Sequence, residues 1–253
     1  MTLRVSAATD VGLRREHNED IYVVWSPAEP AELERRGQLL IVADGMGGSA
    51  AGEVASRTAV ETVLEHYRAS DDQPGPALTN ALERAHQKVH RMSRDQPELA
   101  GMGTTCTAVA VLGNRLWFAH VGDSRAYLLR DGRLKQLTSD HSLVAQLVEQ
   151  RIMTVEQARV DPRRNVLIRS MGVGEVVEVD CGTIEGGLRQ GDTLLLCSDG
   201  LHGLATDEEI TRRMSMSNMD HACSDLIALA LEHGGHDNVT VILARPAAES
   251  AAG

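Results

Sequence analysis

Five aspartates stand at the ends of strand-like segments, and this pattern constrains the fold more than any other feature of the sequence. Asp44, Asp123 and Asp199 each follow an apolar run, whereas Asp20 and Asp237 each precede one. A single aspartate at a strand end is usually a turn residue or a helix cap. Five such residues, three of them followed by Gly or Ser, predict instead that several strand ends converge on one cleft.

Converging carboxylates repel one another unless cations neutralise them. Oxygen ligands without neighbouring His or Cys favour Mg²⁺ or Mn²⁺ over Zn²⁺. Two such ions, about 3.5–4 Å apart, can hold a phosphoryl group and ionise a bridging water. The sequence has no Gly-Lys-Ser/Thr P-loop, no Cys-x5-Arg thiolate loop, no Asp-x-Asp phosphoacceptor and no His-Glu-x-x-His motif. If this chain hydrolyses phosphoesters, water must therefore be the nucleophile.

The order of apolar patterns predicts an α+β fold with mostly antiparallel strands. The expected strands cover residues 3–9, 20–25, 38–43, 105–112, 115–121, 127–130, 134–137, 176–184, 193–197 and 238–244. The expected helices cover residues 50–68, 76–93, 143–150, 155–159 and 219–232.

Two short turns mark hairpins within this pattern, Gly113-Asn114 and Asp131-Gly132. Residues 140–170 break the regularity and are expected to form an insertion. No linker or fixed-period repeat divides the chain, so we expect one domain over residues 1–246 and a loose tail over residues 247–253.

Composition excludes several classes of partner. The formal charge of −11 and the 2% of aromatic residues make nucleic acid an unfavourable ligand. No apolar run is long enough to cross a bilayer, and the first residues do not resemble a signal peptide, so no membrane insertion is expected. The four cysteines form no C-x-x-C pair, which is typical of a reducing compartment, and we expect the protein to be cytoplasmic.

Seven motifs together resemble one known family, the metal-dependent protein serine/threonine phosphatases of the protein phosphatase 2C (PPM) family, in its compact bacterial form. The motifs are Arg15-Glu16-His17-Asn18-Glu19-Asp20, Val42-Ala43-Asp44-Gly45-Met46-Gly47-Gly48 with Ala51-Gly52-Glu53, Gly101-Met102-Gly103-Thr104-Thr105, Val121-Gly122-Asp123-Ser124-Arg125, Thr138-Ser139-Asp140-His141-Ser142, Ser198-Asp199-Gly200 and His236-Asp237-Asn238-Val239-Thr240. The resemblance runs from about residue 5 to residue 245. It implies a central antiparallel β-sandwich flanked by helix pairs, a four-layer αββα arrangement, with residues 140–170 forming a flap beside the cleft. It also implies hydrolysis of phosphoserine and phosphothreonine with Mn²⁺ or Mg²⁺.

The same resemblance implies a metal ligand set. Asp44 would bridge two ions, and the Gly45 carbonyl would bind the second of them. Asp199 and Asp237 would complete the first ion's protein ligands. Glu19 would act on the second ion through a water molecule.

Three further roles follow from the resemblance. Asp123, together with Asp199, would hold a third ion. Asp20 would accept a hydrogen bond from the nucleophilic water, and Arg15 would grip the phosphate, for which a guanidinium fork is well suited.

The sequence departs from the family at two positions. Met46 stands where eukaryotic members carry a His after the Asp-Gly pair, and Ser49 stands where many bacterial relatives carry one. Neither imidazole can therefore protonate the leaving group, and a metal-bound water is the expected donor. His17, His141 and His236 are interpreted as hydrogen-bonding or packing residues.

The expected partners are phosphorylated proteins, including an opposing bacterial Ser/Thr kinase. Basic flap residues could meet acidic phosphopeptides or could be ordinary surface charges: Arg151, Arg159, Arg163 and Arg164. Two other functions remain open at this point. One is a pseudophosphatase that binds phosphoproteins without turnover, and the other is a two-metal phosphodiesterase or nuclease.

Overall fold

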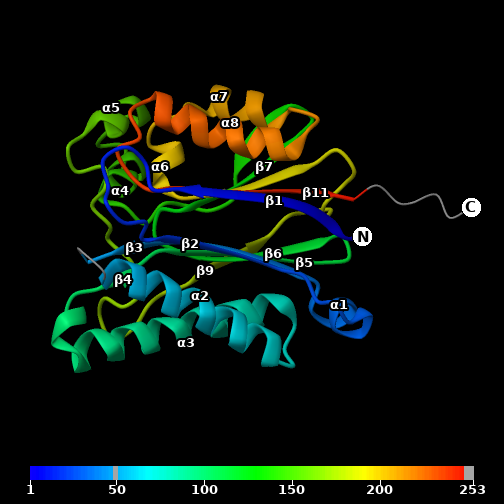
Figure 1. Ribbon diagram of the computed structural model, residues 1–253, viewed down its shortest axis with the longest axis horizontal. Helices are drawn as coiled ribbons and strands as arrows, with labels where there is room; N and C mark the ends of the chain where they lie inside the picture. Colours follow the sequence, from blue (N-terminus) through cyan, green and yellow to red (C-terminus); the bar gives the residue numbers. More distant parts are fainter. Residues whose placement is uncertain (48–50, 248–253) are drawn as a thin grey trace, which may run out of the picture.

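The computed structural model describes residues 1–47 and 51–247, and it is built around two antiparallel β-sheets (Figure 1). The first sheet has the strand order β1-β11-β10-β7-β8, with bounds Leu3–Asp10, Val239–Pro246, Thr193–Cys197, Arg125–Arg130 and Arg133–Gln136. The second has the order β2-β3-β5-β6-β9, with bounds Asp20–Trp25, Gln38–Met46, Cys106–Leu112, Arg115–Val121 and Asp180–Thr183. A short strand β4 (Gly103–Thr104) pairs with the end of β3. The predicted α+β class with antiparallel pairing is confirmed.

Helices cover both outer faces of the sandwich (Figure 1). Helices α2 (Ala51–Ala69) and α3 (Pro74–Asp95) lie side by side on the second sheet. Helices α6 (Asp199–His202), α7 (Asp207–Met214) and α8 (Met219–Glu232) lie on the first. The remaining helices are α1 (Pro30–Arg36), α4 (Leu143–Glu149), α5 (Val155–Val160) and the 3₁₀ turn η1 (Pro97–Leu99). The four-layer αββα architecture expected from the sequence is thus confirmed.

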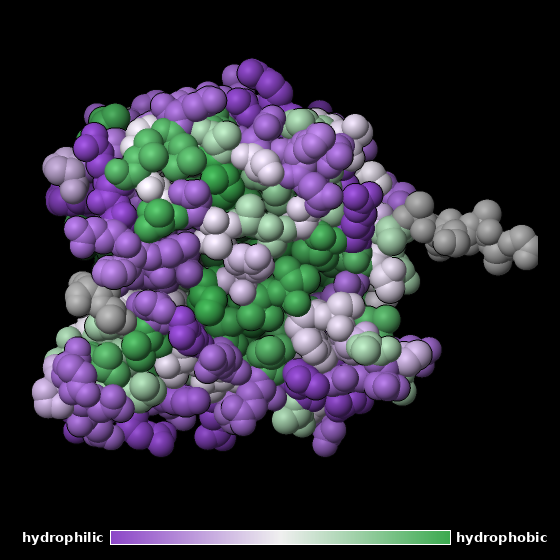
Figure 2. Space-filling view, in the orientation of Figure 1, coloured by the Kyte–Doolittle hydropathy of each residue, from purple (hydrophilic) through white to green (hydrophobic). Residues whose placement is uncertain are grey.

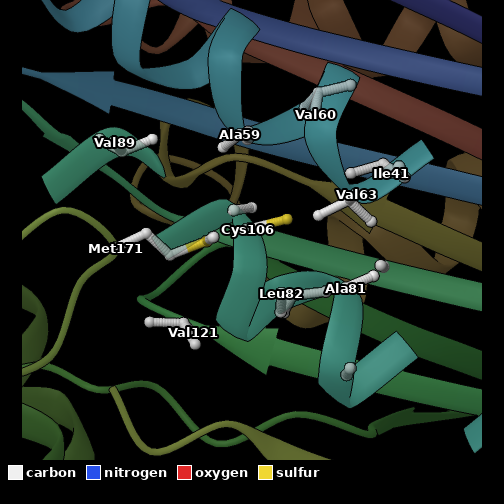
Figure 3. Packing of buried hydrophobic residues seen from close by; sticks show 14 of the residues in the cluster. Ile41, Ala59, Val60, Val63, Ala81, Leu82, Val89, Cys106, Val121 and Met171 are labelled. Atoms are coloured by element: carbon white, nitrogen blue, oxygen red, sulfur yellow. The ribbon is translucent and has the colours of Figure 1, made fainter. Parts of the chain in front are cut away.

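Hydrophobic side chains fill the space between each pair of layers. Between the helices and the second sheet, α2 contributes small residues such as Ala55 and Ala59, and α3 contributes Leu82. Figure 3 shows Ala59 and Leu82 in this cluster, together with Ile41 of β3, which lies next to Val63 of α2. Alanines on α2 allow the two helices to pack closely while Val and Leu fill the remaining volume. This rigid packing fixes the strand ends on which the candidate site is built.

The two hairpins lie where the sequence predicts them. Strands β7 and β8 are joined by Asp131 and Gly132, whose φ angles are 51° and 73°. Positive φ at both positions is typical of the type I′ turn, which matches the twist of the strands it joins. Strands β5 and β6 are joined at Gly113, with φ 61°.

The predicted strand over 176–184 is wrong in its first half, because β9 begins only at Asp180. Positive φ at Gly172 and Gly174 turns the chain before it reaches the sheet, and Val176 is left 86% exposed. Helices α1 and α7 were not expected from the sequence. Both are short, and α7 is stabilised by a capping box at Thr206 and Glu209.

The two sheets present their first edges on the same side of the molecule. In the described part of the chain, β1 pairs only with β11, and β2 only with β3. Figure 2 shows hydrophobic residues in the middle of this face, between more polar regions above and below.

Within the described residues, no helix combines the length and apolar character that a bilayer crossing requires. At the other end of the chain, the Ala247 amide donates to the Thr2 carbonyl (2.8 Å), and the rest of the predicted tail lies outside the described residues.

Candidate metal centre

The pairing of β2 with β3 places Asp20 directly opposite Asp44. The backbone of Asp44 is held from the neighbouring segment: its amide donates to Thr105 Oγ1 (2.9 Å), and its carbonyl oxygen accepts from the Thr104 hydroxyl (2.8 Å). The end of β3 is therefore fixed on both sides. Two of the predicted acidic residues come together in this way.

The first sheet brings two further aspartates to the same end of the sandwich. Asp199 begins α6 directly after β10, and Asp237 directly precedes β11. The Ser198 amide donates to the Thr240 carbonyl (3.1 Å), and the Thr240 amide donates to Ser198 Oγ (3.0 Å). The Ser198 hydroxyl then donates to Asp20 Oδ2 at 2.6 Å. This hydrogen bond joins the ends of the two sheets.

The carboxylates raise one another's pKa. Burial, together with the negative charges of Asp199 and Asp237, raises the pKa of Asp20 to about 7. Burial and the charge of Asp20 hold the pKa of Asp44 well above its usual value. Burial and Asp237 raise the pKa of Asp199 to about 6, although a hydrogen bond with Asp44 acts in the opposite direction. The centre therefore carries excess negative charge that the surrounding protein does not balance.

Three buried oxygens at this centre have no hydrogen-bond partner among residues 1–47 and 51–247: Glu19 Oε1, Asp20 Oδ1 and Asp199 Oδ1. Leaving a buried acceptor unpaired costs about 1–3 kcal/mol, and a hard cation would satisfy such oxygens. Among residues 1–47 and 51–247, however, no three acidic, histidine or cysteine side chains converge into a complete ligand set. The donor chemistry thus fits divalent ions, while the carboxylates lie near one another without forming a finished coordination sphere.

Close backbone packing explains the glycines of the motif around Asp44. The Glu19 carbonyl accepts hydrogen bonds from the Gly45 amide (3.1 Å) and the Ser56 hydroxyl (2.6 Å). A Cβ atom at Gly45 would overlap the Gly52 carbonyl oxygen, and one at Gly52 would overlap Glu19 Oε1. Burial raises the pKa of Glu19 despite the nearby Arg15. The start of α2 is thereby pressed against Glu19 and Gly45.

Arg15 lies at the margin of the centre. Its Nη2 donates to Asp237 Oδ2 at 2.7 Å, and its side chain is half-exposed. Asn238, to which the sequence analysis gave no role, holds the loop that carries Arg15. Its side-chain amide donates to the carbonyls of Val11 and His17 (both 2.9 Å), and its Oδ1 accepts from the Glu19 amide (2.8 Å). Its position directly after Asp237 is the signal that could have identified it.

Asp123 lies in the turn after β6 and is buried. Burial and the charge of Asp199 hold the pKa of Asp123 well above its usual value. The Asp123 carbonyl oxygen is hydrogen bonded to His202 Nε2 (2.9 Å). His202, on α6, is a second neighbour that the sequence analysis did not single out.

Met46 pairs with Gly103 at the start of β4, and Ser49 lies outside the described residues. Of the histidines in the motifs, His141 is buried: its Nδ1 accepts from the Gly122 amide (3.0 Å), and its Nε2 lies 3.2 Å from Asp180. These contacts match the hydrogen-bonding role expected for it.

Residues 140–170, the expected flap, approach the centre at their C-terminal part. Arg164 and Asn165 line a hollow together with Asp199 and Asp237. Two of the other basic flap residues are engaged elsewhere, since Arg163 pairs with Asp161 (2.9 Å) and Arg159 with Asp207 (3.6 Å). Arg164 is thus the basic flap residue at the hollow.

Comparison with known proteins agrees with this geometry. The family model described as protein phosphatase 2C matches residues 27–229. The chain is 42% identical over 248 residues to the serine/threonine protein phosphatase PstP of Mycobacterium tuberculosis, covering 96% of this chain and 45% of PstP. It is 36% identical over 241 residues to the serine/threonine phosphatase stp of Listeria monocytogenes, covering 93% of this chain and 92% of stp. The chain belongs to the protein phosphatase 2C family.

Solved structures support the same assignment. The catalytic domain of PstP in complex with two manganese ions superposes with a TM-score of 0.80 at 38% identity, covering 96% of this chain and 97% of that one. The serine/threonine phosphatase Stp1 from Staphylococcus aureus superposes with a TM-score of 0.88 at 32% identity, covering 98% and 96%. The chain spans less than half the length of M. tuberculosis PstP.

Proposed function

We propose that this chain is a metal-dependent protein serine/threonine phosphatase that hydrolyses phosphoserine and phosphothreonine with Mn²⁺ or Mg²⁺. The observation that carries the proposal is that Asp20 and Asp44 of one sheet lie at the same end of the sandwich as Asp199 and Asp237 of the other, with buried oxygens that have no partner among the described residues. The resemblance to phosphatases, one of them solved with two manganese ions, supports the same reading.

The proposed ligands are those implied by the family motifs. Asp44 would serve both ions, the Gly45 carbonyl would serve the second, and Asp199 and Asp237 would serve the first. Glu19 acts through water, which its buried, unpaired Oε1 would permit. When bound, the ions offset the clustered negative charge, acidify a water molecule and neutralise charge on the phosphoryl group.

Asp123 is proposed to hold a third ion together with Asp199, whose charge helps to raise the pKa of Asp123. Asp20 accepts a hydrogen bond from the attacking water and so orients it. Arg15, half-exposed beside Asp237, grips the phosphate oxygens through its guanidinium. Because Met46 provides no imidazole, the leaving group takes its proton from water.

We further propose that the substrates are phosphoproteins, among them a Ser/Thr kinase that the enzyme opposes. A reducing, cytoplasmic setting suits the four cysteines, none of which is paired.

The test is phosphate release from a phosphothreonine peptide and from an aryl phosphate, with Mn²⁺ and with chelator. We expect hydrolysis of both substrates with the metal and none with the chelator. Activity that survives chelation would contradict metal dependence, and faster hydrolysis of an aryl phosphodiester would point to a phosphodiesterase. Peptide binding without turnover by fully metal-loaded protein would point to a pseudophosphatase.

A further inference from the structure

The Ser198 hydroxyl forms hydrogen bonds with two strands, β11 and β2. The residue is fully buried at the end of β10. Its Oγ accepts from the Thr240 amide at 3.0 Å, so its only hydroxyl proton remains free for an acceptor. That proton is donated to Asp20 Oδ2 at 2.6 Å, a length typical of a bond from a hydroxyl to an ionised carboxylate.

The two oxygens of Asp20 therefore have different surroundings. Oδ2 is held by Ser198, whereas Oδ1 is buried and has no hydrogen-bond partner. The Asp20 amide donates to Asn18 Oδ1 (3.1 Å), which fixes the backbone at the same residue. A carboxylate held at its backbone and at one oxygen presents the other oxygen in a single direction.

The strand that supplies Thr240 is itself supported. The Thr240 hydroxyl is hydrogen bonded to the Thr9 hydroxyl (2.7 Å), and Thr9 Oγ1 accepts from Asn18 Nδ2 (2.9 Å). The bonds thus run from Asn18 through Thr9 and Thr240 to Ser198 and back to Asp20. Such a closed set of partners keeps the Ser198 hydroxyl pointing at Asp20.

We propose that Ser198 is a positioning residue, which fixes Asp20 so that its Oδ1 faces the attacking water. The inference rests on the proposed function, in which Asp20 is the acceptor for that water. Ser198 makes no contact with the phosphate in this scheme and acts only through Asp20. The competing explanation is that its hydroxyl merely fastens the ends of the two sheets together.

A double-mutant cycle on kcat separates the two explanations. We expect Ser198→Ala to lower kcat for the phosphothreonine peptide roughly 10- to 100-fold, as for loss of a hydrogen bond to a charged group, with little change in KM. In an Asp20→Ala background, the same substitution is expected to have no further effect on kcat. The matched control is Thr193→Val, which removes another buried hydroxyl from β10, one that accepts from Arg245 (2.9 Å). It should lower thermal stability and leave kcat unchanged.

Thermal unfolding of the same variants gives a readout that does not depend on turnover. The proposal would be overturned if the effects of the Ser198 and Asp20 substitutions on melting temperature were non-additive while their effects on kcat were additive. That result would show that the hydroxyl only joins the two sheets. Should Ser198→Ala fail to fold, Ser198→Cys keeps a similar shape with a weaker donor, and its kcat should fall below that of the wild type. Full activity of folded Ser198→Cys or Ser198→Ala would equally overturn it. A wild type that binds Mn²⁺ but releases no phosphate would instead defeat the proposed function, and the wild-type arm alone would reveal this.

Discussion

Largely buried aspartates lie in two places at the same end of this molecule. In one place a basic side chain neutralises the carboxylate, and in the other none does. Asp140 is held by Arg125, whose Nε and Nη2 reach both carboxylate oxygens at 2.6–3.1 Å. Although burial acts to raise it, the charge and hydrogen bonds of Arg125 hold the pKa of Asp140 below its usual value. Asp20 is buried and Asp44 and Asp199 are partly buried, yet the pKa values of all three are raised.

The pKa of Asp140 differs from those of the other three because Asp140 has a basic partner, and not because it is less buried. A carboxylate with its own guanidinium is complete within the protein, and its role is to hold the chain together. A group of carboxylates without matching cations is incomplete, and the missing charge must come from a ligand. This contrast supports the proposal that the centre at Asp44 is the site of chemistry and that the pair at Asp140 is structural.

Among the substitutions that test this contrast, Asp44→Asn is expected to cause the largest loss of activity. Because this residue is proposed to serve two ions, Asp44→Asn should lower kcat/KM by more than ~10³-fold, whereas loss of one transition-state contact is typically worth ~10²–10³. In the presence of chelator the same variant should melt at a higher temperature than the wild type, since one repelling charge is removed. Peptide hydrolysis and thermal melts measure both quantities.

Asp123→Asn is the comparison for that experiment. Its loss of activity should be much smaller, because Asp123 is proposed to serve only the third ion. Equal and mild losses for the two variants would contradict the ranking of the ligands.

The opposite behaviour is expected of the paired aspartate. Asp140→Asn leaves Arg125 buried without its partner, so the free energy of unfolding should fall by about 3 kcal/mol or more. Asp71→Asn is the matched control, because Asp71 faces Arg35 on the exposed surface and should have little effect. Denaturant titration measures both variants. A neutral result for Asp140→Asn would remove the distinction between the two groups.

The pH dependence of stability should also separate the groups. A carboxyl whose pKa is higher in the folded state than in the unfolded state stabilises the fold at low pH and loses that contribution as pH rises through the folded value. For Asp20, the stabilising contribution to the free energy of unfolding should disappear as pH rises from about 4 to the raised pKa of about 7. In chelator, Asp20→Asn should therefore be more stable than the wild type at pH 8, and the advantage should vanish near pH 4. An advantage that did not change with pH would contradict the raised pKa.

The smallest expected effect is at Arg15, which is exposed and pairs with Asp237 from outside the cluster. Arg15→Ala should raise KM for the phosphopeptide by roughly tenfold while kcat changes less, if its contact is similar in the ground and transition states. Steady-state kinetics give the two parameters separately. A fall in kcat with unchanged KM would assign Arg15 to the transition state instead.

Local sequence patterns were sufficient for most of the fold. Aliphatic runs and turn residues located nearly all the strands, since Leu39–Ala43 and Thr193–Cys197 are short apolar runs typical of buried strands, and Asp131-Gly132 is a strong signal for a tight turn. The errors fall where tertiary contacts decide. Valines at 176–179 have strand propensity, but two glycines keep this segment away from the sheet.

The candidate site could be predicted in its residue types but not in its internal bonds. The aspartates are visible as interruptions of apolar runs. Ser198 and Asp20 are 178 residues apart on different sheets, whereas Arg125 of β7 and Asp140, in the loop after β8, are 15 apart. The packing of the two sheets brings the first pair together and the β7–β8 hairpin the second, so nothing in the local sequence distinguishes the paired aspartate from the unpaired ones.

The central claim is that the unpaired group holds divalent ions, and anomalous diffraction from a manganese-soaked crystal tests it most directly. The account predicts two peaks within coordination distance of the Asp44 carboxylate, with Asp199 and Asp237 on the first ion and the Gly45 carbonyl on the second. A crystal that takes up manganese elsewhere, with no peak beside Asp44, would contradict it.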